Sequence, residues 1–279
     1  MGVSVGDGPA GAALLATVPL VLVHALSSRL GRLDGAPRHR LLSAAGGVPV
    51  AYVFLSLLPG LGRGQAALEQ LGPASPLAAL SDHVYLVALT SFLAFYGLER
   101  LANGHPSASP AVGPPARGPA GRASHAAPNA RPDAAPNGSS GVAPGAVVFW
   151  LHLGSFALTN ALTGFLLVQR ARLGARPLAV FAGAMTLWFL VNDRGLHAHY
   201  GARYAGVGRW VLALALLGGW AAGAFAARPP GLVPILLQAV IAGSVLLNVL
   251  SAEVPRDRYS KFWPFALGAA AYGVLLLAL

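Results

Sequence analysis

Ionisable and amide side chains occur within long apolar stretches of this sequence. Two adjoining stretches contain His152, Asn160 and Asp193, and apolar stretches elsewhere contain His24 and Asn248. A polar side chain inside a bilayer is costly, so it usually faces the protein interior and often an ion or substrate path. Imidazole and carboxylate groups together bind zinc, iron, nickel or manganese, and they also serve as proton relays.

Counting about 1.5 Å per residue along the expected helices gives each of these groups a depth. The groups that share a layer near the inner boundary are His24, His152, Asp193, Asn248 and Glu253. Asn160 lies roughly 21 Å above that boundary, which predicts that Asp193 is too low to meet it. All six residues are candidate metal ligands, and a surface salt bridge is the alternative for Glu253.

A polar stripe follows one face of the expected helix at 146–169. It contains His152, Ser155, Thr159 and Thr163 at helical spacing. The alternative to a functional stripe is hydrogen bonding between packed spans. His197 and His199 form a His-x-His pattern, which is a weak metal signal, and we interpret it as a wet interfacial segment.

Composition places the chain among membrane proteins. Of 279 residues, 55% are hydrophobic and 10% are charged, and the mean hydropathy is +0.61. A soluble domain has about a quarter of its residues charged. The net charge is +10, and the basic residues that produce it lie between apolar segments. They therefore indicate membrane topology and contacts with lipid headgroups. We expect no nucleic-acid partner. The chain has no cysteine, which excludes thiolate chemistry, and no nucleotide-binding loop appears.

Runs of roughly 20 apolar residues, the length of a membrane-spanning helix, recur about eight times. They lie at 10–29, 41–61, 81–101, 146–169, 177–192, 208–227, 231–252 and 262–279. No strand pattern appears, so the predicted fold class is all-α, a polytopic helical membrane bundle. The chain divides into spans one to three (1–102), a loop rich in Pro, Ala, Gly and Ser that we expect to be disordered (103–144), and spans four to eight (145–279).

The distribution of basic residues predicts the orientation. Most of the 19 Lys and Arg residues lie after spans one, three, five and seven. By the positive-inside rule these loops are cytoplasmic, including 103–144, and both termini are outside. High usage of Arg, Ala and Gly is typical of a GC-rich bacterial genome and predicts a multi-pass protein of the bacterial inner membrane.

Three features resemble the ZIP family of divalent-metal transporters. They are the topology, the segment Phe-Leu-Ser-Leu-Leu-Pro-Gly-Leu at 54–61, and the segment Ser-Ala-Glu-Val-Pro at 251–255. The family's span-four signature is His-Asn-x-Pro-Glu-Gly, where this chain reads Thr-Asn-Ala-Leu-Thr-Gly at 159–164. Asp193 corresponds to the acidic residue of the span-five signature, and Leu196 stands in the place of its Glu. The chain thus resembles a divergent bacterial member that lacks most signature ligands.

The resemblance implies a carrier and not an enzyme, with zinc or another divalent metal as its substrate. The expected partners are the lipid bilayer and the metal ion, and a homodimer is an allowed assembly. The first alternative is a ZIP-like membrane protein that binds a partner or another solute and carries no metal. The second is an intramembrane metal hydrolase, in which His and Asp would hold zinc and activate water.

Overall fold

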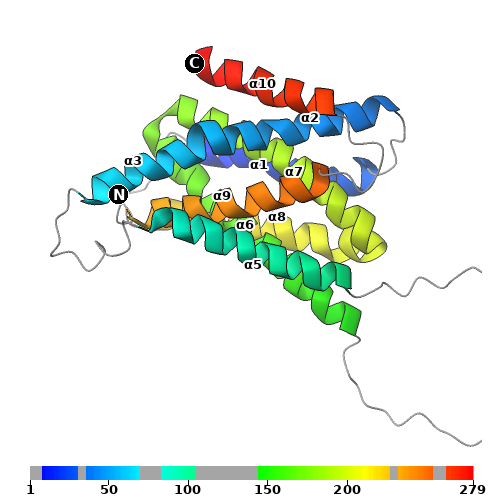
Figure 1. Ribbon diagram of the computed structural model, residues 1–279. Helices are drawn as coiled ribbons and strands as arrows, with labels where there is room; N and C mark the ends of the chain where they lie inside the picture. The colour runs from blue at the N-terminus through cyan, green and yellow to red at the C-terminus, as the bar shows by residue number, and fades with distance from the viewer. Residues whose placement is uncertain are drawn as a thin grey trace, which may run out of the picture.

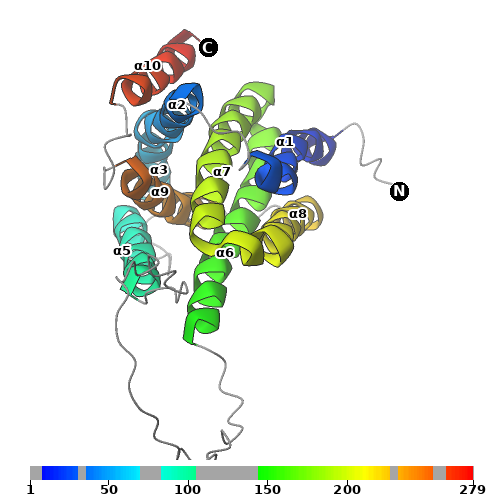
Figure 2. The same ribbon diagram turned by 90° about the vertical axis from the view of Figure 1, so that its right-hand side faces the viewer.

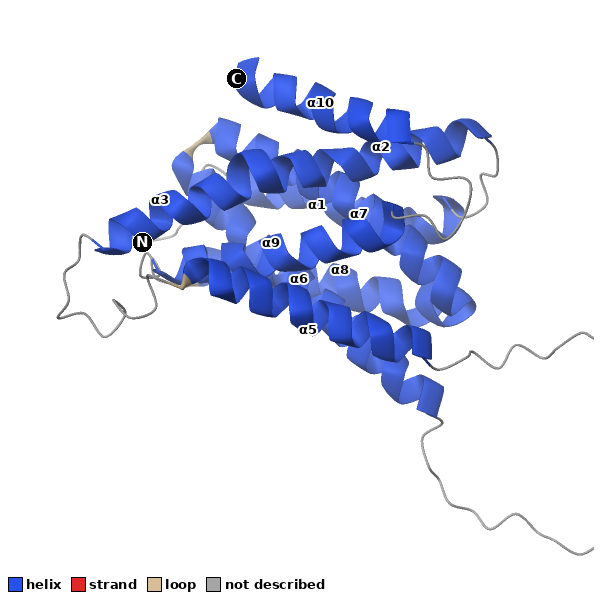
Figure 3. Ribbon diagram, viewed as in Figure 1, coloured by secondary structure: helices blue, strands red, loops and turns tan. Residues whose placement is uncertain are grey.

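Every regular element that the structure describes is a helix, as predicted. The computed structural model describes residues 8–30, 36–69, 83–104, 144–226, 232–253 and 262–278 (Figures 1 and 3). Its elements are α1 (Pro9–Leu30), α2 (Ala36–Tyr52), the π-helix η1 (Val53–Leu57), α3 (Leu58–Glu69), α5 (Val84–Gly104), α6 (Pro144–Leu173), α7 (Ala175–Arg203), the π-helix η2 (Tyr204–Gly208), α8 (Arg209–Phe225), α9 (Leu232–Glu253) and α10 (Phe262–Ala278). The predicted disordered segment lies almost wholly outside the described residues.

The helices form a bundle of the kind found in membranes. Five helical stretches are long and apolar enough to cross a bilayer, and one of them, Ala175–Phe225, contains both α7 and α8. Large apolar side chains cover the outside as well as the interior: Leu15 is 73% exposed and Leu214 is 67% exposed. Such a surface suits contact with lipid rather than with water. The number of eight crossings stays a prediction.

Two of the helical runs change their geometry part-way. The run from α2 to α3 widens into η1 just before Pro59, which has no amide hydrogen and would clash with a carbonyl one turn earlier in a regular α-helix. The run from α7 to α8 bends at Gly201, whose φ of 52° and ψ of −125° interrupt the helical conformation. Glycine adopts such a positive φ at little cost, so the bend depends on it. The bend turns α8 back along α1.

Small residues let helix pairs approach closely. A Cβ atom added at Gly219 of α8 would lie 1.8 Å from the Ala161 carbonyl oxygen of α6. At Gly268 of α10 it would lie 2.0 Å from the Ala44 carbonyl oxygen of α2, and Gly243 of α9 packs equally closely on α5. Close approach through small residues is a main source of helix association in membranes.

The long helices α6 and α7 occupy the centre of the bundle. Figure 2 shows α1 and α8 on one side of them, and α2, α9, α5 and α10 on the other. Large apolar side chains of α7, among them Phe181, Met185 and Trp188, are fully buried in this core. The centre of the bundle is therefore where α1, α6 and α7 can bring polar groups together away from lipid.

Candidate functional site: a buried His–Asp–Asn cluster

Three of the candidate residues meet inside the bundle. His24 of α1 lies between Asp193 of α7 and Asn160 of α6, and none of the three is more than 1% exposed. The Nδ1 atom of His24 is 2.9 Å from each carboxylate oxygen of Asp193, and its Nε2 atom is 2.7 Å from Oδ1 of Asn160. We call His24, Asn160 and Asp193 the buried cluster.

The helices that carry the cluster are fixed around it by further contacts. The ring of Phe189, one turn before Asp193 on α7, packs against the imidazole of His24 with centroids 4.9 Å apart. On α1, the Ser27 hydroxyl donates to the His24 carbonyl at 2.9 Å, and Arg209 of α8 donates to the neighbouring Ala25 carbonyl at 3.1 Å. These contacts hold the imidazole at a set position between α6 and α7.

The hydrogen-bond pattern shows where the protons lie. The Asn160 side-chain amide donates through Nδ2 to the Phe156 carbonyl at 2.8 Å, so its Oδ1 is the atom that faces His24. Nε2 of His24 must therefore donate, because an amide oxygen only accepts. On the other side, a proton lies between Nδ1 and the Asp193 carboxylate. The His24–Asp193 pair is thus neutral overall, either as imidazolium and carboxylate or as imidazole and carboxylic acid.

Further polar groups lie close to Asp193. Tyr204 is fully buried, and its hydroxyl interacts electrostatically with Asp193 and Ser27 without reaching the geometry of a regular hydrogen bond. The Asn192 side-chain Nδ2 and the His197 Nδ1 are buried and have no partner among the described residues. Sequence reasoning missed Ser27 at this site, although its spacing of three from His24 places both on one helix face.

His152 is not part of the buried cluster. It lies on α6 two helical turns before Asn160, and its Nδ1 is 2.8 Å from the hydroxyl of Tyr200, on the part of α7 beyond Asp193. The predicted layer of His24 with Asp193 is therefore confirmed, and the structure does not bring His152 into it. Asp193 and Asn160 contact His24 on opposite sides, so the large difference in depth predicted between them is wrong, although no direct contact joins their side chains among the described residues.

The remaining candidates are Asn248 and Glu253. Both belong to α9 by their backbone, but their side chains lie outside the part of the chain that the structure describes. Their role as ligands stays a prediction. Among the described residues, no three His, Asp or Glu side chains come together. The buried cluster offers one imidazole, one carboxylate and one amide oxygen.

The hydroxyls of the α6 stripe bond to their own helix. Ser155 donates to the His152 carbonyl at 2.7 Å, Thr159 donates to the Ser155 carbonyl at 3.1 Å, and Thr163 donates to the Thr159 carbonyl at 2.8 Å. Hydrogen bonding between packed spans was the alternative to a functional stripe, but these three hydroxyls donate within α6 instead. Such back-bonding satisfies a hydroxyl locally. The stripe adds no ligand to the cluster.

A second polar link lies toward the far end of α6, about 15 Å from Asn160 along the helix. The Arg170 guanidinium donates to the side-chain oxygen of Gln238 on α9 and lies 5.7 Å from the ring centroid of Phe181. Gln238 in turn donates through Nε2 to the Leu57 carbonyl at 2.9 Å. Arg170 and Gln238 therefore tie α6, α9 and η1 together on the side of the cluster opposite to His152.

Comparisons with protein-family models and with curated proteins found no match. The resemblance to the ZIP family stays a prediction from the motifs alone. The functional argument therefore rests on the chemistry and position of the buried cluster.

Proposed function

We propose that the protein is a membrane carrier of a divalent metal ion such as zinc, and that the buried cluster is the binding site. The observation that supports this proposal is the fully buried His24–Asp193 pair between helices of a membrane bundle. Ionisable groups at such positions are rare, and in membrane proteins they commonly belong to ion pathways. The site transports rather than catalyses, so no enzymatic turnover is expected.

The donor atoms of the cluster suit such an ion. Imidazole nitrogen is a typical ligand for zinc and its first-row neighbours. Metal-binding histidines commonly donate their other ring N–H to a carboxylate, which orients the ring. In the cluster Asp193 holds Nδ1 in this way, which leaves Nε2 of His24 and Oδ1 of Asn160 as the atoms on the metal side.

Metal binding at this site requires the release of a proton. Nε2 of His24 carries a hydrogen that points at Asn160, and a metal ion bonds only to the lone pair that this hydrogen occupies. The incoming ion therefore displaces one proton from the His24–Asp193 pair. Transport is then an exchange of metal for proton, and metal uptake rises with pH.

Transport in reconstituted vesicles tests the proposal. The purified chain is placed in liposomes that contain a zinc-sensitive dye, and zinc entry is followed after zinc is added outside. We expect zinc entry with the wild type and with His152→Gln, whose side chain lies outside the cluster, and background entry with His24→Gln. If His24→Gln transports zinc like the wild type, or if no folded form transports a divalent metal, the proposal is wrong.

One observation favours an alternative, a membrane protein that carries no metal. Both ring nitrogens of His24 are already hydrogen-bonded within the protein, so the cluster can serve to tie α1, α6 and α7 together. In that case His24→Gln would lower the stability of the protein, and zinc entry would be at background in the wild type and in both variants. The vesicle assay and a thermal-unfolding assay on the same variants separate the two functions.

We also propose the topology that the basic residues predict: a multi-pass protein of the bacterial inner membrane with both termini outside. The chain contains no cysteine, so a single introduced cysteine reports one position without any further change. Ser107→Cys, in the loop predicted to be cytoplasmic, should react with a membrane-impermeant maleimide only after cells are opened. Leu279→Cys should react in intact cells, and the reverse pattern would contradict the orientation.

A further inference from the structure

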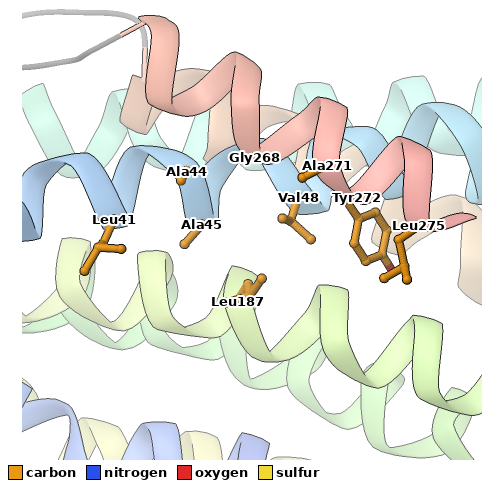
Figure 4. A pocket seen from close by; sticks show the side chains of 9 residues that line it. All are labelled: Leu41, Ala44, Ala45, Val48, Leu187, Gly268, Ala271, Tyr272 and Leu275. Atoms are coloured by element: carbon orange, nitrogen blue, oxygen red, sulfur yellow. The ribbon is translucent and has the colours of Figure 1, made fainter.

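A groove lies between α10 and α7, beside α2. It has a volume of about 340 Å³ and is lined by apolar side chains from α2, α7 and α10 (Figure 4). The residues whose side chains Figure 4 shows at the groove include Leu41, Ala45, Val48, Leu187, Tyr272 and Leu275. The groove is open on one side to the surface that the membrane covers.

The groove exists because α10 packs closely on only one of its neighbours. A Cβ atom added at Gly47 of α2 would lie 2.2 Å from the Phe265 carbonyl oxygen of α10, so these two helices are in intimate contact. With α7, the Tyr272 hydroxyl of α10 donates to the Val180 carbonyl at 2.6 Å. This bond lies at one end of the groove. Toward Leu41, the space between α10 and α7 stays open.

The Leu41 end of the groove is electropositive. Arg40 is exposed and directly precedes Leu41 on α2. Gly47 of α2 contacts Phe265 of α10, and further along both helices Tyr52 contacts Tyr272, so the two helices run in the same direction and begin toward the same end of the bundle. A hydrophobic groove with the exposed Arg40 guanidinium beside its Leu41 end matches the chemistry of a phospholipid with a negative headgroup.

We propose that this groove binds one anionic phospholipid, with an acyl chain between α10 and α7 and the phosphate at Arg40. The lipid chain would bury apolar surface that the protein leaves unfilled, which is favourable in proportion to the area buried. It would thereby join α10 to the rest of the bundle. Arg40 selects the headgroup, because a basic residue near the membrane surface contributes about 1 kcal/mol of attraction to anionic lipid, which is about fivefold in affinity. The inference does not depend on metal transport.

Native mass spectrometry of the detergent-solubilised protein tests the site. The protein is incubated with dioleoyl phosphatidylglycerol or with dioleoyl phosphatidylcholine, which share the same chains and differ in headgroup charge. Ala271→Phe places a ring in the groove, and Ala270→Phe is its control, because Ala270 is exposed on the same helix and does not line the groove. Arg40→Gln removes the charge at the mouth, and Arg63→Gln removes an exposed arginine of α3.

We expect the wild type and both control variants to retain one phosphatidylglycerol in preference to phosphatidylcholine. Arg40→Gln should weaken that preference about fivefold, the factor that corresponds to about 1 kcal/mol. Ala271→Phe should lose the retained lipid of either kind while keeping the mass and the melting temperature of a folded protein.

The proposal is overturned if the wild type holds no lipid or holds both lipids equally. It is also overturned if Ala270→Phe and Ala271→Phe behave alike. The same spectra report the number of chains in the particle. A dimer that becomes a monomer only in Ala271→Phe, without any change in bound lipid, would show that a second copy of the chain occupies the groove.

Discussion

The bond between His24 and Asp193 makes a quantitative prediction about stability. Replacing Asp193 by alanine removes the carboxylate from a histidine that is 0% exposed. At the observed 2.9 Å, a full ion pair would have an attraction of about 6 kcal/mol for an effective dielectric constant of about 20. His24 can escape part of this loss by giving up its proton, which leaves Nδ1 as a buried nitrogen without a partner at about 1–3 kcal/mol.

We therefore expect Asp193→Ala to lower the free energy of unfolding by about 3 kcal/mol, at the low end of the range for breaking a buried pair. Asp193→Asn should cost less than about 1 kcal/mol. The introduced amide can donate to Nδ1 of a neutral His24, whose Nε2–H still donates to Asn160, so both ring nitrogens of His24 remain hydrogen-bonded. Asp193→Ala should therefore cost more stability than Asp193→Asn, because His24 and Asp193 share one proton that only the asparagine can replace with an N–H.

Thermal unfolding in detergent, followed by tryptophan fluorescence, measures the difference. For a chain of this size about 1 kcal/mol corresponds to a shift in Tm of roughly 2–4 °C. Asp193→Ala should then melt about 6–12 °C below the wild type, and Asp193→Asn no more than about 4 °C below it. Equal losses in the two variants, or no loss in either, would contradict the assignment of one shared proton to the His24–Asp193 pair.

Three further predictions concern other contacts of the structure. Asn160→Ala removes the acceptor of the buried Nε2–H and should lower the free energy of unfolding by about 1–3 kcal/mol in a denaturant titration; no change would mean that the N–H finds another acceptor. Gly219→Ala pushes a methyl group into the α6 backbone and should destabilise by about 1–3 kcal/mol or more, whereas Gly218→Ala, which meets nothing within 4 Å, should be neutral or stabilising; similar melting temperatures would contradict the close packing. Tyr200→Phe removes one partly buried hydrogen bond to His152 and should cost about 0.5–1.5 kcal/mol in the same titration, while a loss as large as that of Asp193→Ala would contradict the separation of His152 from the cluster.

The fold class and one contact of the site could be predicted from the sequence. Long apolar runs must be helical in a bilayer, because a helix satisfies its own backbone hydrogen bonds. His24 and Asp193 were predicted at the same depth, and the structure confirms that they meet.

Asn160 was misplaced because depth was counted from the wrong helix ends. Asp193 was predicted to lie near the inner boundary, but α7 continues to Arg203, so Asp193 lies about 15 Å from the end of its helix. The start of α6 projects beyond the other helices (Figures 1 and 2), so the count from Ala146 overestimates how far Asn160 lies from Asp193. Periodicity in one helix gives its faces, but it does not give the offset between two helices.

The bends of the long helical runs could not be read from hydropathy. A polar segment at 193–207 separates two apolar runs, but hydropathy does not show that the helix continues into this segment and bends at Gly201, shortly before η2. The π-helix η1 likewise adds no distinct pattern of its own, although Pro59 marks where a regular helix is strained. The direction in which α8 returns along α1 depends on the bend at Gly201. The enclosure of the buried cluster depends in turn on where α8 lies, because Arg209 of α8 bonds to α1 beside His24.

The most direct test of the central claim counts metal and protons together. Zinc is titrated into detergent-solubilised wild-type protein in weak buffer, with bound metal measured by mass spectrometry and released protons by a pH indicator. Binding of about one zinc ion per chain with release of about one proton, both lost in His24→Gln and both kept in His152→Gln, is the predicted result. Zinc binding that persists in His24→Gln, or the absence of any bound divalent metal in folded wild-type protein, would contradict a metal site at the buried cluster.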